Sequence, residues 1–334
     1  MRASFLTGYG GDDVMSFGDM PDPIIKDGQA LIDVRAAGVN PVELAMRSGG
    51  FQRVLPYTFP QVPGFDISGV VREVSGQSPF KVGDEVYARM PNRSPGAYAE
   101  RAIVPTDLLA KKPSRVSHIE AASLPTVALT AWQAFFERAL LNKGDRVLIQ
   151  AGAGGAGSVA IQLAKRAGAH VTATAGSANQ QLLRDLGADV AVDYSQQRFE
   201  DFGPYDVVYD GVGGDLIERS ILSLAPGGRY VGLVMVADSR AFVSIGLPEA
   251  IAKAAAAGIA RYEELAASRG AEFHGPLTRP DGAQLAEIAA LVDAGAIKPL
   301  VTQVFGLDQL AAAYQALATK RTRGKLVVDT TKWA

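Results

Sequence analysis

The sequence contains no cysteine, which excludes disulfide scaffolds, iron–sulfur clusters, zinc held by thiolates and a cysteine nucleophile. Histidine is nearly as scarce. The three copies, His118, His170 and His274, are far apart along the chain, so they form no local metal-binding motif. Nor does the sequence contain the run of about eighteen apolar residues that a membrane-spanning helix needs.

An excess of charge of either sign is missing as well. The 33 basic and 35 acidic residues leave a formal net charge of −2, whereas nucleic-acid binders use positive charge to neutralise phosphates. Residues 1–14 hold no apolar run long enough for a secretory signal. We therefore expect a cytoplasmic protein that binds neither nucleic acid nor membranes.

Apolar residues, in contrast, are abundant enough for more than one core. The chain has 334 residues, 48% of them hydrophobic, and at roughly 150 residues per domain this length predicts about two domains. Residues 1–122 alternate short apolar runs with Gly, Pro and Asp turns, and prolines such as Pro56, Pro60 and Pro63 oppose helices there. This pattern predicts a β-rich region.

From Lys143 the pattern changes to strands that alternate with helices. Continuous apolar strands are expected at Arg146–Ala151, His170–Ala175, Asp189–Asp193, Tyr205–Asp210 and Arg229–Val234. Helices are expected at Ser158–Ala167, Asn179–Leu186, Asp215–Leu224 and Pro248–Ser268. The short spacing implies parallel pairing and therefore a doubly wound α/β domain. A final apolar strand, Lys325–Asp329, is expected to return to the N-terminal β-rich region, which leaves the α/β domain inserted between the two ends of the chain.

A glycine-rich loop, Gly152-Ala153-Gly154-Gly155-Ala156-Gly157, lies between the first of these strands and the first of these helices. Its G-x-G-x-x-G spacing is weak evidence alone, but a preceding strand and a following helix are the context that a dinucleotide site requires. Glycines let the backbone approach a pyrophosphate, and the helix N-terminus offers free N–H groups. We predict that Gly152, Gly154, Gly155, Ala156 and Gly157 bind a dinucleotide; a tight turn without a ligand is the alternative.

The end of the next strand indicates which dinucleotide binds. NAD sites place an Asp or Glu about 20 residues after the loop, to bind the ribose 2′-OH. Here the strand ends in Ala175-Gly176-Ser177, and the first acid after it is Asp185 in the next helix. We therefore predict NADPH, bound at Gly176 and by hydrogen bonds from Ser177, Gln180 and Tyr194 to the 2′-phosphate. Such bonds imply a preference over NADH of order ten- to a thousandfold. Ser177 can also serve as a helix N-cap.

Ordered blocks along the whole chain resemble the medium-chain dehydrogenase/reductase superfamily, in particular its zinc-free quinone oxidoreductase branch. The blocks before the loop are Ala37–Glu43, Val62–Asp66, Val82–Tyr87, Gly96–Glu100, Ala121–Pro125 and Leu129–Trp132. Those after it are Leu291–Gly295 and Gly324–Val328. The resemblance implies a GroES-like β-rich domain made of residues 1–122 and 268–334, into which a Rossmann domain, residues 123–267, is inserted.

The resemblance also implies a reaction. Zinc-dependent members of the superfamily use a Cys and a His as metal ligands, and the matching segments here, Asn40-Pro41 and Gly64-Phe65-Asp66, supply neither. It therefore implies zinc-independent hydride transfer from NADPH to quinones or to activated alkenes such as α,β-unsaturated carbonyls. The protein aligns the nicotinamide with its acceptor and excludes water. Two alternatives remain: an enoyl-thioester reductase of the same superfamily, and a non-catalytic NADPH-binding or sensor protein.

Individual roles follow from the same resemblance. Asn40 matches a residue near the nicotinamide that binds the substrate oxygen or the ribose, although Asn-Pro also commonly starts a turn. Thr130 matches a residue beside the nicotinamide, although a helical Thr can instead bond back to a carbonyl. Lys320 and Arg321 correspond to a region that reaches a cofactor phosphate, with a basic helix C-terminus as the alternative. Gln180 stands where some relatives have a lysine.

The proton donor stays open. Positions where some family members have tyrosines hold Ala45 and Phe51, which leaves Tyr57 and Tyr87 as weaker candidates. The variable segments Gly50–Tyr57 and Val236–Leu247 are expected to form pocket walls. Because family members are often dimers, the resemblance also implies a homodimer.

Overall fold

The computed structural model describes residues 1–234 and 237–334, which divide into two compact units. The first contains Met1–Leu129 and Arg279–Ala334, and the second contains Thr130–Thr278. The sequence placed the corresponding boundaries at 122/123 and 267/268. The expected pocket wall Val236–Leu247 begins outside the described residues, and its described part contains helix α7 (Ser239–Ser244).

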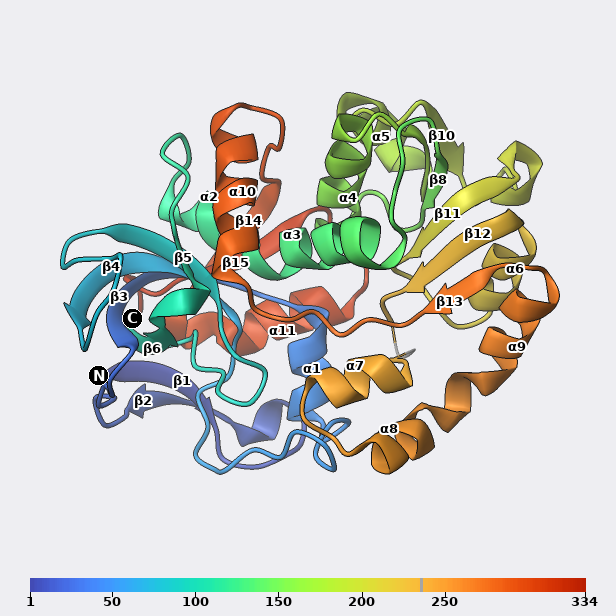
Figure 1. Ribbon diagram of the computed structural model, residues 1–334. Helices are drawn as coiled ribbons and strands as arrows, with labels where there is room; N and C mark the ends of the chain where they lie inside the picture. Colours follow the sequence, from blue (N-terminus) through green and yellow to red (C-terminus); the bar gives the residue numbers. More distant parts are fainter. Residues whose placement is uncertain (235–236) are drawn as a thin grey trace. The chain divides into compact units, whose positions relative to one another are not determined.

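The first unit is built on an extended sheet. Its described strands run in the order β14-β15-β3-β4-β5-β7, and β6 also pairs with β3. They are β3 (Gln29–Gly38), β4 (Asp66–Val74), β5 (Glu85–Arg89), β6 (Arg101–Pro105), β7 (Leu109–Lys111), β14 (Val301–Gly306) and β15 (Lys325–Asp329). A separate antiparallel pair is formed by β1 (Arg2–Leu6) and β2 (Met15–Asp19). Figure 1 shows both chain termini in this unit.

The C-terminal strand completes the N-terminal β-rich region, as the sequence predicted. β15 pairs antiparallel with β3, with Val328 opposite Ala37, and all five residues of β15 are buried. The helices of this unit are α1 (Pro41–Arg47), α2 (His118–Ala122), α10 (Gly282–Asp293) and α11 (Leu310–Ala318). α10 begins where the Asp281 side chain accepts a hydrogen bond from the Gln284 N–H, which is an N-cap.

The second unit contains a parallel sheet. Its described strands run in the order β10-β9-β8-β11-β12-β13 and are β8 (Arg146–Ile149), β9 (His170–Ala175), β10 (Val190–Asp193), β11 (Tyr205–Asp210), β12 (Leu224–Gly232) and β13 (Glu272–His274). The chain moves outward from β8 to β10, then returns to β11 and moves outward the other way. The strand order therefore reverses beside β8, where doubly wound folds bind their ligands.

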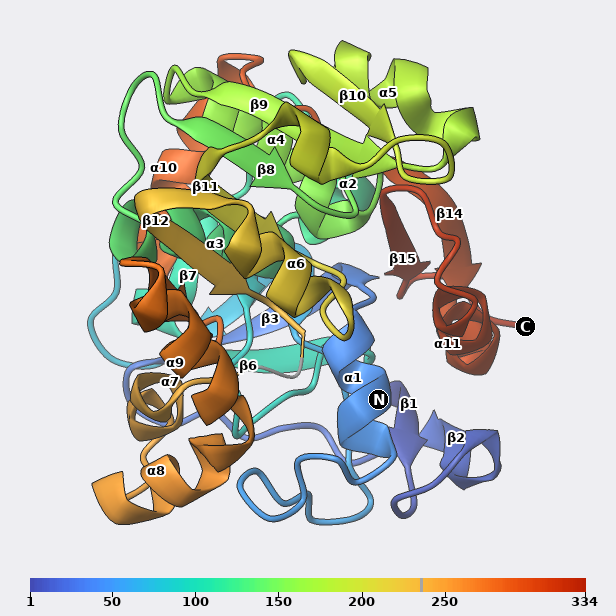
Figure 2. The ribbon, with the colours of Figure 1, turned by 90° about the vertical axis from the view of Figure 1, so that its right-hand side faces the viewer.

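Helices connect these parallel strands. α4 (Gly155–Arg166) and α5 (Gln180–Asp185) contact β8, β9 and β10, while α6 (Leu216–Leu222) and α9 (Ala260–Ser268) contact each other and strands β11, β12 and β13. Figure 2 shows α6 and α9 on the side of the sheet that faces the viewer. α3 (Pro125–Trp132) crosses the boundary between the units and continues as a π-helix, Gln133–Arg138. The predicted GroES-like domain with a doubly wound α/β domain is confirmed.

One predicted helix differs in the structure. The helix expected over Pro248–Ser268 is divided into α8 (Glu249–Ala256) and α9, with a 3-10 turn at Ala257–Ile259 between them. Gly258 lies in that turn, and glycine weakens a helix by roughly 1 kcal/mol relative to alanine. The core of this unit gathers Leu148, Val208, Ile221, Tyr230 and Phe273. Burying one large apolar side chain contributes about 1.5–3 kcal/mol.

Candidate functional site

The glycine loop joins β8 to α4 in the second unit. Gly154 is the N-cap of α4, and no side chain caps the helix there, so the N–H groups of its first turn face outward without a competing side chain. Two of the glycines are closely approached, Gly157 by the backbone of the turn and Gly152 by side chains packed against it. A Cβ on Gly157 would come within 2.3 Å of the Ala151 carbonyl oxygen, and a Cβ on Gly152 within 2.8 Å of Leu183 Cδ2.

Gly154 has different surroundings. Among the described residues, a Cβ there would meet only the Ala151 carbonyl oxygen, at 3.3 Å, and its φ of −79° is one that any residue adopts. Neither packing nor backbone conformation therefore requires glycine at this position. A missing side chain does leave space in front of the helix N-terminus, where dinucleotide folds hold the pyrophosphate. The loop therefore fits the cofactor that the sequence predicts.

The second group of predicted cofactor residues lies at the carboxyl ends of β9 and β10. Gly176 is the N-cap of the short helix Ser177–Asn179, so the Ser177 side chain does not cap it. The Gln180 Nε2 donates to the Ala175 carbonyl oxygen at 2.9 Å. Tyr194 is exposed, and its hydroxyl would lie 3.3 Å from a Cβ on Gly176. The structure thus brings Gly176, Ser177, Gln180 and Tyr194 together.

Sequence reasoning missed an acid at this sheet edge. The Ser177 hydroxyl donates to Asp193 Oδ2 at 2.5 Å. Asp193 Oδ1 also accepts from the hydroxyl of Ser195, at 2.6 Å. The hydrogen bonds from Ser177 and Ser195 lower the pKa of Asp193. NAD sites usually carry their acid after the second strand, whereas Asp193 ends the neighbouring strand β10.

Lys320 and Arg321 follow α11 in the first unit. Both are exposed, and the Lys320 N–H donates to the Leu317 carbonyl oxygen at the end of the helix. Lys320 has a φ of +56°, in the left-handed region that commonly ends helices. This placement matches the alternative, a basic helix C-terminus, and their contact with a phosphate stays a prediction.

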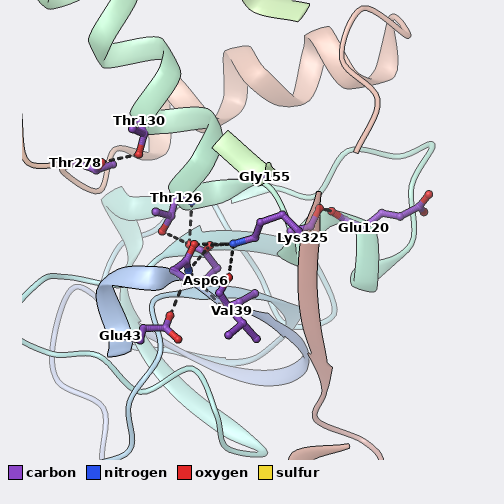
Figure 3. A network of polar contacts seen from close by, with 12 residues as sticks. Val39, Glu43, Asp66, Glu120, Thr126, Thr130, Gly155, Thr278 and Lys325 are labelled. Carbon is purple, nitrogen blue, oxygen red and sulfur yellow. Dashed lines mark hydrogen bonds and ion pairs between the residues drawn. The ribbon is translucent and has the colours of Figure 1, made fainter. Parts of the chain in front are cut away.

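A buried polar cluster of five residues lies in the first unit: Asn40, Glu43, Asp66, Tyr98 and Lys325. Lys325 Nζ donates to Asn40 Oδ1 at 2.6 Å and lies 3.9 Å from Asp66 Oδ2 (Figure 3). Asn40 Nδ2 donates to Asp66 Oδ2 at 3.0 Å and to Glu43 Oε1 at 3.2 Å. The Tyr98 hydroxyl donates to Glu43 Oε2 at 2.5 Å. Asn40, Glu43 and Asp66 are each at most 1% exposed, so water does not screen these charges.

Strand register explains why these residues meet. β3 pairs with β4 and with β15, and Gly38 lies opposite Asp66 on one side and opposite Val327 on the other. Asn40 follows β3 by two residues, while Lys325 begins β15. Three segments far apart in the sequence therefore end at one place. A partial signal was present, because Lys325 begins the otherwise apolar run up to Val328.

The cluster changes the interpretation of Asn40. Its amide nitrogen and its amide oxygen both have partners inside the first unit, which fit a role in holding Lys325 and the two carboxylates. A direct contact of Asn40 with substrate or ribose stays a prediction. Burial raises the pKa of Glu43 to about 7 and also raises that of Asp66, while burial lowers the pKa of Lys325. Glu43 can therefore exchange a proton near neutral pH.

The other candidates have partners of their own. Thr130 Oγ1 and Thr278 Oγ1 share a hydrogen bond of 2.6 Å. They are the first and last residues of the second unit, so this bond joins the points where the chain enters and leaves it. The Tyr87 hydroxyl is buried and donates to the Leu285 carbonyl oxygen at 2.5 Å. Tyr57 contacts the sulfur of Met46 at 3.4 Å, and burial raises its pKa.

The first unit is a GroES-like sheet completed by the end of the chain, and the second is a Rossmann domain with an open glycine turn. Together they define a dinucleotide-dependent oxidoreductase. Two family models match: the alcohol dehydrogenase GroES-like domain over residues 26–114 and the zinc-binding dehydrogenase family over residues 186–328. The NAD(P)H oxidoreductase RTN4IP1 of Danio rerio is 33% identical over 98% of this chain and 91% of its own length. The chain belongs to the medium-chain dehydrogenase/reductase superfamily.

Two further relatives describe the branch. The 2-methylene-furan-3-one reductase of Solanum lycopersicum is 33% identical over 98% of this chain and 79% of its own length. The solved quinone oxidoreductase of Coxiella burnetii is 32% identical, with a TM-score of 0.87 over 99% of both chains. A solved mycobacterial structure complexed with NADPH is 28% identical, with a TM-score of 0.78 over 98% of this chain and 99% of its own. The predicted branch and the predicted cofactor agree with these relatives.

The expectation of a cytoplasmic protein was wrong. The Danio rerio and human NAD(P)H oxidoreductases are mitochondrial, and the Arabidopsis thaliana NADPH-dependent alkenal/one oxidoreductase is chloroplastic. Within the described residues, no helix has the length and apolarity to cross a membrane. Neither that observation nor the composition of residues 1–14 separates the cytoplasm from the interior of an organelle, so they could not support the expectation.

Proposed function

We propose that this protein transfers hydride from NADPH to quinones or to α,β-unsaturated carbonyls without the help of zinc. The observation that carries the proposal is the glycine turn at α4, where Gly154 leaves space at an uncapped helix N-terminus. Relatives named as a methylene-furanone reductase, an alkenal/one oxidoreductase and a quinone oxidoreductase support this range of acceptors.

Bound NADPH supplies a hydride, which together with one proton converts a quinone to a hydroquinone or an activated alkene to the saturated carbonyl compound. The chain's own residues bind the cofactor and orient it. The first turn of α4 offers N–H groups to the pyrophosphate, and the ends of β9 and β10 receive the adenosine ribose. Thr130 is the residue that we place beside the nicotinamide, and its hydroxyl is oriented by Thr278.

The residues at the family's zinc position do not fit zinc. Catalytic zinc sites need Cys, His or carboxylate groups with free lone pairs. Here Phe65 offers none, and the Asn40 amide N–H and the Lys325 ammonium are already directed at the Asp66 carboxylate. A divalent cation there would lie beside the Lys325 charge. We therefore expect no stoichiometric zinc by elemental analysis and unchanged activity in EDTA.

The test is NADPH oxidation by the purified protein, with a naphthoquinone and with an alkenone as separate acceptors. Gly154→Val places a side chain where the pyrophosphate belongs, so we expect its affinity for NADPH to fall about tenfold or more while its thermal stability stays unchanged. Gly258→Val is the matched control, because a Cβ on Gly258 meets no described atom within 4 Å. Tight NADPH binding by Gly154→Val would refute the loop assignment. Binding without turnover of either acceptor would instead indicate a sensor.

A further inference from the structure

Asp193 lies at the sheet edge where the sequence indicated no acid. It is the last residue of β10, which pairs in parallel with β9, and it lies directly opposite Ala175, the last residue of β9. Gly176 and Ser177 follow Ala175 directly in the sequence. The carboxylate is therefore placed on the segment that we assign to the adenosine ribose, although it comes from the next strand along the sheet.

The two serine hydroxyl groups at this edge are already used. Ser177 donates its proton to Asp193 Oδ2 at 2.5 Å, and Ser195 donates its proton to Asp193 Oδ1 at 2.6 Å. The Ser195 backbone N–H adds a third hydrogen bond to Oδ1, at 3.0 Å. A serine hydroxyl has only one proton to donate. A 2′-phosphate can therefore take a hydrogen bond from the Ser177 hydroxyl only by displacing Asp193.

Two other donors were predicted, Tyr194 and Gln180. Tyr194 is exposed and keeps one neutral hydroxyl to offer a phosphate, but Gln180 does not add a second donor. Gln180 Nε2 donates to the Ala175 carbonyl oxygen at 2.9 Å, so this amide holds the end of the strand. A phosphate oxygen within hydrogen-bond distance of Ser177 Oγ would lie about 5 Å or less from Asp193 Oδ2. Because the hydrogen bonds from Ser177 and Ser195 lower the pKa of Asp193, the carboxylate is negatively charged at neutral pH and repels the phosphate. The 2′-OH of NADH carries no such charge and can donate a hydrogen bond.

We propose that Asp193 is a specificity-determining residue that weakens the preference for NADPH, so that the protein also accepts NADH. This inference rests on the proposed function, because it places the adenosine ribose at the ends of β9 and β10. It replaces the preference of order ten- to a thousandfold, which assumed that Ser177, Gln180 and Tyr194 donate to the phosphate and that no acid is near.

The test compares dissociation constants for NADPH and NADH in the full-length protein, in Asp193→Asn and in Asp185→Asn. Asp193→Asn keeps the shape of the side chain and removes its charge, so we expect NADPH to bind about tenfold more tightly, with NADH unchanged or weaker. The gain should shrink at high salt. Asp185→Asn removes the same charge from the exposed last residue of α5 and should leave the ratio of the two constants unchanged.

Ser177→Ala gives an independent measurement that does not depend on how Asp193→Asn folds. If the Ser177 proton belongs to Asp193, this variant should bind NADPH within about twofold of the parent protein. A tenfold loss would overturn the inference, since the hydroxyl would then be binding the phosphate. If folded Asp193→Asn keeps the parent's ratio of the two dissociation constants, this inference is overturned but the proposed function is not. A folded parent protein that binds neither cofactor would overturn the proposed function as well.

Discussion

Lys325 provides a prediction about stability that follows directly from its surroundings. Lys325→Met keeps the length of the side chain and removes the ammonium, which donates to Asn40 Oδ1 at 2.6 Å and to the Val39 carbonyl oxygen at 2.7 Å. The Lys325 side chain is 6% exposed and that of Asp66 is 0% exposed. Water therefore does not replace the lost donor, and the Asp66 carboxylate stays buried without its cation.

The expected cost can be worked out from these contacts. Hydrogen bonds to a charged group contribute roughly 1.5–3 kcal/mol each, and removing one partner of a buried ion pair costs about 3–5 kcal/mol. Asp66 Oδ1 still accepts from the backbone N–H and the hydroxyl of Thr126, at 2.9 and 2.6 Å. We therefore expect the lower part of that range, a loss of about 3 kcal/mol in the free energy of unfolding. For a domain of this size, Tm should fall by about 10 °C.

Urea and thermal unfolding, followed by circular dichroism, would measure this loss. Lys332→Met is the matched control from the same end of the chain. Lys332 is 75% exposed and lies 3.1 Å from Asp329, so we expect a change of no more than about 0.5 kcal/mol. A loss below about 1 kcal/mol in Lys325→Met would refute the reasoning, because it would mean that the buried cation contributes no more than a surface pair.

Three further predictions concern the cluster and the loop. Because the pKa of Glu43 is raised from 4.5 to about 7, the folded state keeps a proton that the unfolded state loses, so the free energy of unfolding should fall by about 3 kcal/mol as pH rises through that range. Glu43→Gln should flatten this part of the pH profile, and parallel profiles would contradict the assignment. Ala151 has a φ of +54°, which strains any residue that has a Cβ. Ala151→Gly should therefore raise the free energy of unfolding by about 1 kcal/mol in urea; a lower free energy of unfolding would contradict this strain. Gly157→Ala should cost about 1–3 kcal/mol, because its Cβ would lie 2.3 Å from the Ala151 oxygen; unchanged urea unfolding would argue against this close approach.

The elements that the sequence predicted well are those whose signals are local. Most strands of the parallel sheet are apolar runs, such as Tyr205–Asp210, of which five residues are buried. The short edge strand β13 (Glu272–His274) has no such run and was not predicted. The glycine loop was also recognisable, since its neighbouring strand and helix lie next to it in the sequence. The return of Lys325–Asp329 to the N-terminal region was expected from its place so far along the chain, while its parallel pairing with the nearby β14 was not predicted. Gly258 shows the limit of predicting helices from apolar periodicity. The periodicity predicted one continuous helix, but the structure has a 3-10 turn at this glycine.

The buried polar cluster could not be predicted in the same way. It depends on the register of three strands, and a shift of one residue between β3 and β4 would turn Asp66 away from Asn40. The resemblance placed Asn40 near the nicotinamide on the basis of position alone. Position does not reveal that Lys325, 285 residues away in the sequence, donates a hydrogen bond to the amide oxygen of Asn40. Hydrogen-bond capacity is a property of the folded neighbourhood, so a matched residue can have its amide already bonded elsewhere.

Asp193 illustrates why cofactor preference is harder to predict than cofactor binding. Binding depends on the backbone of a loop, which is continuous in sequence. Preference depends on the charge within a few ångströms of one phosphate, and that charge can come from any strand that ends at the same edge of the sheet. In a parallel sheet, neighbouring strands end together, so Ala175 and Asp193 lie opposite each other although eighteen residues separate them. An acid must therefore be sought along the sheet edge as well as along the chain. Here the end of β9 carries no charge, whereas Asp193 at the end of β10 adds a negative charge that repels a 2′-phosphate.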